Sequence, residues 1–370
     1  MARVLYASFD EVPSYKGAST HILAFCRALA QEHRVTLLTL GDRPLPPWHG
    51  FTHGVFPLDE PNPLRRGLAF RERVSAWLTR HPVDVVHFRS PWEGVAAADL
   101  GVPCVYEVNG LPSMELSYHY PKVTGHTLEV LSRWEARCLA VASAVVCPAE
   151  QIRTNLLVRH PEVEPGRITV IPNGYFEVTL SRRRPRRPPD QPVPLVYLGT
   201  LSPWQGVFWA LRALRGLGER FSLDIYAPYH RVLSPLAEKC IRTFSLAGTV
   251  RLCGPVDRVR FSEVLPRYAV GLCPLTPTSR NLEQGCCPVK LLDYASFGLW
   301  AVAPDLPAVR EVVTQGKSGF LYRAGDPDSF RQALMDAASA PAAPHPRDGG
   351  LVTWEEAGRR LRRVYSALVT

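Results

Sequence analysis

The sequence has 370 residues, of which 46% are hydrophobic and 21% charged, a globular balance that excludes a disordered, collagen-like or coiled-coil chain. At about 150 residues per domain, this length predicts two domains. The formal net charge of +9 favours anionic partners, and nucleotide diphosphates, acidic lipids and nucleic acids all qualify.

The nine cysteines form no CxxC pair and no even framework, so they predict neither a structural zinc site nor a disulfide scaffold. Free thiols predict a reducing, cytoplasmic location. No apolar run reaches the roughly 18 residues of a membrane helix. The opening segment, MARVLYASFD, also lacks the pattern of a secretory signal. We therefore expect a soluble chain without a targeting segment.

Strand and helix patterns alternate along the first half of the chain. A strand at 3–9 is followed by a glycine-containing loop, a helix with one apolar side and a second strand at 34–40. This order is typical of a βαβ unit, whose strands are parallel and whose loops bind ligands at their carboxyl ends. The pattern continues with helices at 65–80 and 125–142 and strands at 83–88, 102–108, 144–148 and 167–174.

Residues 181–194 interrupt this alternation with five arginines and five prolines. The prolines exclude a helix interior or a central strand. We interpret the segment as a solvated, proline-stiffened hinge, and contact with an anionic surface is the alternative.

The alternation then resumes and predicts a second α/β domain. Its elements are strands at 194–200, 222–228, 249–255, 269–275 and 300–305 and helices at 206–217, 232–245, 261–267 and from about 289. We expect residues 1–178 in the first domain, 179–193 in the hinge and 194–352 in the second domain, with ligands in the cleft between them. Spacing does not assign the last helix, from about 354 to 368, to either domain.

Small residues in the segment KGASTH, 16–21, lie between a strand end and a helix start. There they let backbone N–H groups approach an anion or a sugar. A tight turn capped by Ser19 or Thr20 explains the segment equally well.

Asn109 in EVNG follows a buried strand directly, where its amide can both donate to and accept from sugar hydroxyls. Asn-Gly is also the commonest turn dipeptide, so a turn is the alternative. The similar segment IPNG, 171–174, is interpreted as the crossing into the hinge.

The segment LGTLSPWQG, 198–206, is a strand-to-helix loop of the second domain that would face the first. It places Thr200, Gln205 and Gly206 towards the cleft. Trp204 is interpreted as a core residue.

The segment EQGCCPVKLLDYASFG, 283–298, predicts a helix that starts after Pro288 and ends at Gly298. Free N–H groups near Val289 and Lys290 would then point at a ligand in the cleft. Asp293 lies one turn further on, so a lysine for phosphates and a carboxylate for vicinal hydroxyls share one face. The alternative is an exposed ion pair between Lys290 and Asp293.

In their order along the chain, these segments resemble the retaining GT-B glycosyltransferases of family 4. The matching segments are KGASTHILAFCRAL, VIPNG, YLGTLSPWQG and PVKLLDYASFGLWAVAPDLPAVREVVTQGKSGFLY. The resemblance implies an α/β GT-B fold, with two Rossmann-like domains facing a central cleft and a C-terminal helix, 353–370, that crosses back to the N-terminal domain. It implies transfer of a sugar from a nucleotide-diphosphate sugar to an acceptor hydroxyl with retention of configuration.

The resemblance, combined with the residue patterns, implies three groups of site residues. Catalytic roles are expected for Asn109, Lys290 and Glu283. The acceptor side is expected at Ser19, His21, His87 and Asn109. The donor nucleotide and sugar are expected at Gly17, Ala18, Thr200, Gln205, Gly285, Cys286, Cys287, Val289, Lys290 and Asp293.

Two departures from the family pattern affect the donor site. Gly199-Thr200 and Gln205-Gly206 stand where the family usually has Gly-Arg and Lys-Gly, so two cations at the phosphates are absent and Lys290 replaces part of their charge. The family's two glutamates, eight positions apart, become Gly285 and Asp293. Asp293 is then expected to hold the ribose, and Glu283 or the N–H groups of 285–287 the sugar hydroxyls. The donor sugar and base stay open.

The resemblance implies that the enzyme supplies no nucleophile, and that the helix start and Lys290 stabilise the leaving diphosphate. No metal or other cofactor is expected. Closure of the domains about the hinge would exclude water.

Two alternatives stay open. One is another GT-B enzyme, such as a nucleotide-sugar epimerase or an inverting transferase. An inverting transferase would need a general base near the acceptor, for which His21 and His87 are candidates, although each could instead be a buried, satisfied histidine. A nucleic-acid-binding protein would use the arginines of the hinge, but no helix-turn-helix, RNP or zinc-finger pattern accompanies them.

The expected partners are a nucleotide-sugar donor and an acceptor that is a glycan, a lipid-linked sugar or a small molecule. The positive charge is also compatible with peripheral contact at the anionic inner face of a membrane.

Overall fold

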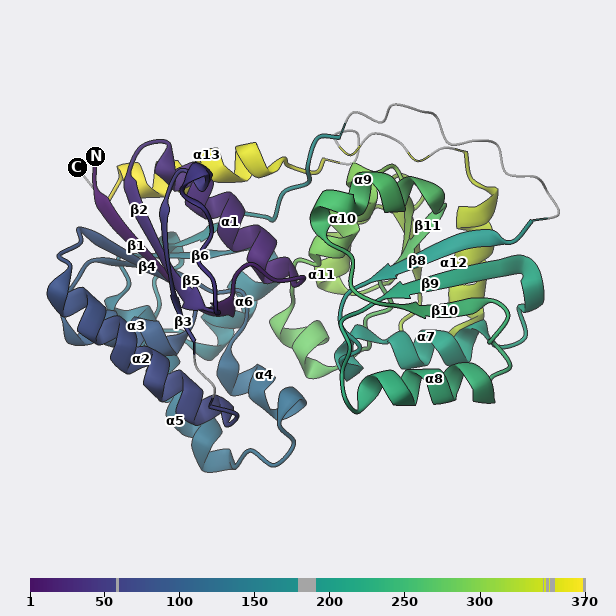
Figure 1. The fold of residues 1–370 in the computed structure, drawn as a ribbon, viewed down its shortest axis with the longest axis horizontal. Helices are drawn as coiled ribbons and strands as arrows, with labels where there is room; N and C mark the ends of the chain where they lie inside the picture. Colours follow the sequence, from purple (N-terminus) through teal and green to yellow (C-terminus); the bar gives the residue numbers. More distant parts are fainter. Residues whose placement is uncertain (58–59, 179–190, 342, 344–345, 347–349, 369–370) are drawn as a thin grey trace.

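The computed structural model describes residues 1–57, 60–178, 191–341, 343, 346 and 350–368. Within these residues the chain forms two domains that lie side by side, each built on a parallel sheet (Figure 1). The predicted α/β fold with two Rossmann-like domains is confirmed. Residues 179–190 of the expected hinge lie outside the described residues.

The first domain contains a sheet of seven described strands in the order β3-β2-β1-β4-β5-β6-β7, all parallel. Strand order reverses between β1 and β4, and the carboxyl ends of strands at such a point form the usual ligand site. The strands are β1 (Arg3–Glu11), β2 (Arg34–Leu40), β3 (Thr52–Phe56), β4 (Val85–Phe88), β5 (Cys104–Glu107), β6 (Ala144–Cys147) and β7 (Ile168–Val170). The helices are α1 (Gly17–Ala30), α2 (Pro63–Arg80), α3 (Pro91–Asp99), α4 (Pro112–His119), α5 (Gly125–Val141) and α6 (Glu150–Arg159).

The second domain repeats this plan with six described strands in the order β10-β9-β8-β11-β12-β13, again parallel. The strands are β8 (Val193–Leu198), β9 (Phe221–Tyr226), β10 (Val250–Cys253), β11 (Val270–Leu272), β12 (Trp300–Pro304) and β13 (Gly319–Tyr322). The helices are α7 (Val207–Leu214), α8 (Leu233–Thr243), α9 (Phe261–Val264), α10 (Val289–Ser296), α11 (Pro307–Arg310) and α12 (Pro327–Ser339). A π-helix, Arg280–Gln284, precedes α10.

Helices cover both faces of each sheet, so the central strands are buried throughout. Every residue of β4, β5, β6 and β12 is buried, as the near-continuous apolar runs predict. Phe70 and Phe88 lie in the core on one face of the first sheet, and Phe25 and Tyr6 lie in the core on the other.

The last helix, α13 (Trp354–Ser366), returns to the first domain, as predicted from the family resemblance (Figure 1). Its residues Ala357, Leu361 and Tyr365 are fully buried against that domain. Gly174 allows this approach, because a Cβ there would overlap the backbone at the start of α13. Arg362 adds an ion pair to Glu32 at 2.8 Å.

Several elements were not predicted from periodicity. β3 contains a histidine and a glycine, and α3 is apolar around most of its circumference, so neither has a clear strand or helix pattern. α12 does have a start signal, Asp326 followed by Pro327. Across the described residues, no helix combines the length and the apolar character needed to cross a membrane.

Candidate active site between the two domains

Helix α10 begins at the interface between the two domains. An added Cβ at Gly17, the first residue of α1, would lie 3.2 Å from the side chain of Val289, the first residue of α10. Figure 1 shows both helices on the facing sides of the two domains. The first turn of α10, with its free N–H groups and the positive end of its dipole, therefore lies against the first domain.

Lys290 lies in this first turn and its ammonium group is held in place. Its Nζ donates to Gln205 Oε1 at 2.6 Å and lies 4.2 Å from the centre of the Tyr197 ring. A Cβ at Gly199, whose φ is +139°, would lie 3.1 Å from the same Nζ. Burial lowers the pKa of Lys290. Three of the residues singled out in the sequence, Gln205, Gly199 and Lys290, thus come together at one point.

The rest of the 198–206 loop has local roles. The Thr200 hydroxyl lies 3.0 Å from Ser202 Oγ. The backbone carbonyl of Thr200 accepts a hydrogen bond from the Tyr197 hydroxyl at 2.6 Å. Trp204 is buried, as predicted, and it also meets His119 of the first domain edge to face. The loop therefore contributes to the domain interface as well as to the surroundings of Lys290.

Asp293 is 5% exposed, and Arg258 occupies both of its carboxylate oxygens. The predicted alternative, an exposed ion pair with Lys290, is wrong, because the two side chains take different partners. Burial raises the pKa of Asp293, and the Arg258 guanidinium opposes that rise. Arg258 also donates to Thr20 Oγ1 at 3.3 Å and lies 4.6 Å from the centre of the Phe176 ring.

The loop before α10 runs along the first domain. Gly285 has a φ of +83° and packs so closely on Gln151 of α6 that a Cβ would come within 2.9 Å of its Oε1. The carbonyl of Cys287 accepts a hydrogen bond from Asn173 Nδ2 at 2.9 Å. Burial raises the pKa of the Cys286 thiol, and that of Cys287 to about 12, so both thiols stay protonated near neutral pH.

Glu283, expected to act in catalysis, is exposed on the π-helix. Its neighbour Gln284 is buried and reaches the first domain instead. Gln284 Oε1 accepts from the N–H of Leu111 at 2.8 Å, and its Nε2 donates to Glu115 at 2.8 Å. Arg280 also pairs with Glu115, at 2.9 Å.

A second interdomain contact lies at the start of α6. Glu311, which follows α11, accepts hydrogen bonds from the backbone N–H groups of Glu150 at 2.8 Å and Gln151 at 2.9 Å. A carboxylate at a helix start is stabilised by the free N–H groups and by the dipole. The two domains are therefore connected by polar contacts at several separate points.

Helix α1 contributes Gly17, which lies against Val289, and Thr20, which accepts a hydrogen bond from Arg258, to this interface. Its N-cap residue is Lys16, which makes no side-chain cap bond, so the predicted cap by Ser19 or Thr20 is wrong. The Ser19 hydroxyl accepts from the N–H of Ser14 at 3.1 Å and so orders the preceding loop. Ala18 is partly buried in the first turn.

His21 lies on α1 one turn after Gly17, and its side chain is buried between Asn173 and Glu107. Its Nδ1 lies 2.5 Å from Asn173 Oδ1, and its Nε2 lies 2.9 Å from Glu107 Oε1. Asn173 therefore bridges His21 and the carbonyl of Cys287 before α10.

His87 is fully buried in β4. Its Nε2 lies 3.0 Å from Glu107 Oε2, its Nδ1 lies 3.0 Å from the Tyr365 hydroxyl, and its ring stacks on Tyr6. Burial lowers its pKa. This is the satisfied core histidine that the sequence left as the alternative to an acceptor-side base.

Asn109 follows β5, and its Nδ2 donates to Glu107 Oε1. The loop that it begins touches the second domain through Leu111 and Gln284. Asn109 is partly buried and lies two residues before this contact with the second domain.

Four residues of this region were not proposed from the sequence: Glu107, Asn173, Arg258 and Gln284. Glu107 had a visible signal, a carboxylate at the end of an otherwise apolar buried strand. Asn173 lay in a segment interpreted as the crossing into the hinge, and Arg258 and Gln284 had no distinguishing pattern.

The spacing Asp326-Pro327-Asp328 matches the DxD pattern of metal-binding sites, but Asp326 caps α12 by accepting from the N–H groups of Asp328 and Ser329. Within the described residues, no three His, Cys, Asp or Glu side chains gather in a way that could hold a metal ion. The expectation that no metal is needed stays a prediction.

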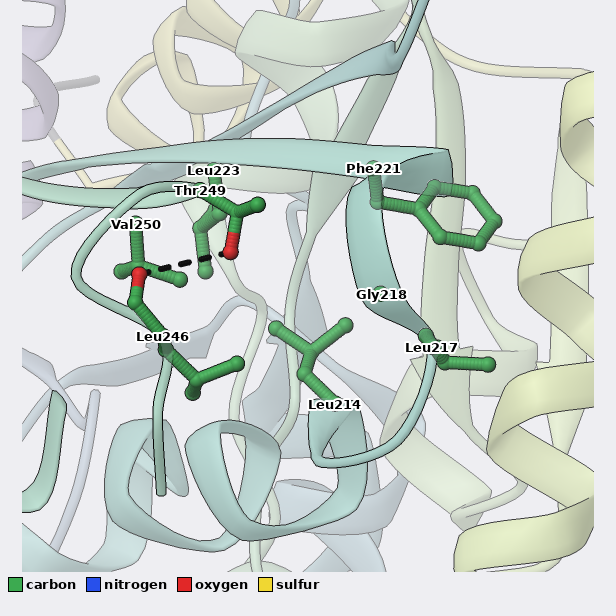
Figure 2. A pocket seen from close by; sticks show the side chains of 8 residues that line it. All are labelled: Leu214, Leu217, Gly218, Phe221, Leu223, Leu246, Thr249 and Val250. Atoms are coloured by element: carbon green, nitrogen blue, oxygen red, sulfur yellow. Dashed lines mark hydrogen bonds between the residues drawn. The ribbon is translucent and has the colours of Figure 1, made fainter. Parts of the chain in front are cut away.

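A small cavity of about 10 Å³ lies in the second domain, lined by apolar residues of α7, β9 and β10, among them Leu214, Leu223 and Val250 (Figure 2). It has room for about one water molecule. It lies within the core of that domain, between a helix and the sheet, and has no part in the interdomain site.

Two family models match the chain. The model described as Glycosyltransferase Family 4 matches residues 15–175, and the model described as Glycosyl transferases group 1 matches residues 192–339. The chain belongs to family 4 of the glycosyltransferases. Both the first-domain segments and the α10 region of this family 4 chain fall within the matched ranges.

Curated relatives of this family 4 chain include α-maltose-1-phosphate synthase of Mycolicibacterium smegmatis, 26% identical over 267 residues, which covers 61% of the chain and 64% of the relative. The chain thus spans just under two thirds of the length of that enzyme. D-inositol 3-phosphate glycosyltransferase of Streptomyces avermitilis is 25% identical over 348 residues, covering 86% of the chain and 69% of the relative.

Solved structures show the same GT-B fold as this family 4 chain. Sucrose-phosphate synthase from Thermosynechococcus elongatus has a TM-score of 0.79 at 16% identity, covering 100% of this chain and 99% of that one. Anabaena HepE in complex with UDP-glucose has a TM-score of 0.74 at 15% identity, covering 99% and 100%.

Proposed function

We propose that this chain transfers a hexosyl group from a nucleoside-diphosphate sugar to an acceptor hydroxyl with retention of the anomeric configuration. One observation carries the proposal: the amino end of α10 faces the first domain with Lys290 in its first turn and Asp293 one turn further on. A helix start and a lysine suit a diphosphate, and a carboxylate suits the vicinal hydroxyls of a ribose.

In this mechanism the diphosphate lies against the first turn of α10. Burial lowers the pKa of Lys290, and an anion beside its ammonium group favours the charged form. Negative charge grows on the diphosphate as the sugar leaves, so the N–H groups and Lys290 stabilise the transition state where that charge forms. Lys290 thereby replaces part of the charge that the family usually has near Thr200 and Gln205.

The carboxylate of Asp293 would accept hydrogen bonds from the ribose. Arg258 neutralises that carboxylate in this structure, so a bound ribose would share Asp293 with the guanidinium or displace it. The first turn of α1 and Asn109 would face the transferred sugar and the acceptor, since both lie on the first domain beside the interface.

The similar HepE structure holds UDP-glucose, so UDP-glucose is the first donor to test. The acceptor is proposed to be a glycan, a lipid-linked sugar or a small molecule. The net charge of +9 and the exposed Arg65, Arg73 and Arg80 of α2 suit an acceptor at an anionic membrane surface. Co-sedimentation with phosphatidylserine vesicles would test this location.

Calorimetry with UDP, GDP and ADP tests the donor site. We expect at least one of them to bind and to raise the melting temperature, because a ligand of the folded state stabilises it by about 2.7 kcal/mol at one hundred times its dissociation constant. If none binds at millimolar concentration, the proposed function is wrong.

Incubation with the matching nucleotide sugar and a panel of acceptors then tests the reaction. NMR of the product should show the anomeric configuration of the donor. An inverted product would refute retention, and a change in the donor sugar without transfer would indicate an epimerase.

A further inference from the structure

A single buried carboxylate, Glu107, makes side-chain contacts with helix α1, with strands β1 and β4, and with the residues that follow β4 and β5. It is 1% exposed and ends β5 at the interdomain edge of the sheet. Its contacts are Arg89 Nε at 2.7 Å, His21 Nε2 at 2.9 Å and Asn109 Nδ2 on one oxygen, and Tyr6 Oη at 2.5 Å and His87 Nε2 at 3.0 Å on the other.

Glu107 is ionised in this setting. Burial disfavours the charged form, but His21 and Arg89 beside it hold the pKa of Glu107 well below its usual range. Arg89 is itself buried and also pairs with Asp10. A carboxylate that keeps its charge at 1% exposure needs this many donors, because an unpaired buried charge is very costly.

An ionised carboxylate can only accept hydrogen bonds, and this fixes the orientation of Asn109. The amide nitrogen of Asn109 must face Glu107, so its carbonyl oxygen Oδ1 faces the other way. Asn109 therefore offers an acceptor to its remaining surroundings.

Those surroundings lie at the interface between the domains. Two residues after Asn109, the N–H of Leu111 donates to Gln284 of the second domain at 2.8 Å. The other arm of the cluster runs from Glu107 through His21 and Asn173 to the carbonyl of Cys287, just before α10. Glu107 thus connects Asn109 with the loop that leads into α10.

We propose that Glu107 is a positioning residue, which holds Asn109 with its carbonyl oxygen towards the bound sugar so that it accepts a hydrogen bond from a sugar hydroxyl. This proposal rests on the proposed function, because it assumes that a nucleotide sugar binds at the interface. Glu107 touches no substrate itself and acts through Asn109.

The test compares the affinity for UDP with that for UDP-glucose, measured by calorimetry on the full chain. If wild type prefers another base, the pairs ADP and ADP-glucose or GDP and GDP-mannose replace them. Asn109→Ala should weaken UDP-glucose binding about five- to tenfold, the effect of one lost hydrogen bond, and should leave UDP binding unchanged. Glu107→Gln should do the same, and the exposed Glu129→Gln of α5 serves as its matched control.

The double variant decides whether Glu107 acts through Asn109. We expect the combined Glu107→Gln and Asn109→Ala protein to bind UDP-glucose no more weakly than the poorer single variant, because both changes remove the same contact. Losses that multiply would assign Glu107 a separate structural role and overturn the proposal.

Asn109→Asp keeps the test decisive if Glu107→Gln does not fold. It places two carboxylates side by side, so UDP-glucose binding should be weak at neutral pH and recover relative to wild type as the pH falls and one of them is protonated. The titratable and charged groups that face this pair are Tyr6, His21, His87 and Arg89. The wild-type protein contains the same four groups, so its own pH profile is the control for their titration.

The outcomes separate the two proposals. A wild-type chain that binds no nucleoside diphosphate refutes the proposed function. A wild-type chain that binds UDP, while Asn109→Ala and Asn109→Asp leave the preference for UDP-glucose over UDP unchanged at every pH, refutes the positioning role alone.

Discussion

Replacing Lys290 by alanine tests the donor site most directly. Lys290 lies in the first turn of α10, and its Nζ lies 2.6 Å from Oε1 of Gln205. A hydrogen bond to a charged group is worth about 1.5–3 kcal/mol, so Lys290→Ala should weaken UDP binding roughly 10- to 100-fold. Because Lys290 is partly buried, salt screens its interaction with the diphosphate only weakly, and we expect a loss of UDP affinity near the upper end of this range.

The same substitution should barely affect folding. Burial already lowers the pKa of Lys290, so the ammonium group is held there at a cost that its removal relieves, while Gln205 loses its partner. We expect these effects to offset each other and the free energy of unfolding to change by no more than about 1 kcal/mol.

Calorimetry with UDP and with uridine separates the two parts of the ligand. Uridine carries no phosphate, so Lys290→Ala should leave its affinity unchanged. Lys239→Ala, an exposed lysine of α8, is the matched control and should leave both affinities unchanged. If wild type binds UDP and Lys290→Ala binds it equally tightly, the diphosphate does not lie at the start of α10 and the reasoning fails.

Four further predictions follow from named contacts. Asp293→Asn should weaken uridine binding and lower the melting temperature, because Arg258 loses a buried charge partner; an unchanged uridine affinity in calorimetry would remove Asp293 from the ribose site. Glu311→Gln should loosen the contact between the domains by about 0.3–1 kcal/mol, seen as faster hydrogen exchange at the first amides of α6, and equal exchange would contradict it. Gly174→Ala should lower the free energy of unfolding by about 1–3 kcal/mol in denaturant titration, since the new methyl group overlaps the start of α13; wild-type stability would refute this. The pKa of Glu107 lies well below the usual 4.5, so the stability that Glu107 contributes should be fully present above pH 4.5 and be lost as the pH falls towards its pKa in the folded state, which acid titration of the circular dichroism signal measures.

Most elements of the fold could be predicted because each has a local signal. The apolar runs of β4, β6 and β12 and the start of α10 after Pro288 are visible within a few residues of sequence. β3 was missed because its short run, THGVF, is half polar or small and lies at the edge of the sheet.

The site could be predicted only in part, for a different reason. Strand ends and helix starts revealed where Asn109, Lys290 and Asp293 would lie. Their partners are set by tertiary contacts between distant segments: Arg258 lies 35 residues from Asp293, and Gln284 lies 173 residues from Leu111. Spacing along the chain does not encode such pairings, and this is why an ion pair between Lys290 and Asp293 was a reasonable but wrong alternative.

The return of α13 to the first domain affects how the protein is made. Domains generally fold in order as they leave the ribosome. Here Leu361 and Tyr365 complete the core of the domain that is synthesised first, and Tyr365 also contacts the buried His87. That domain reaches its final packing only after residues 354–366 have been translated, so ribosome-bound chains stalled before them should be cut by protease within residues 1–178.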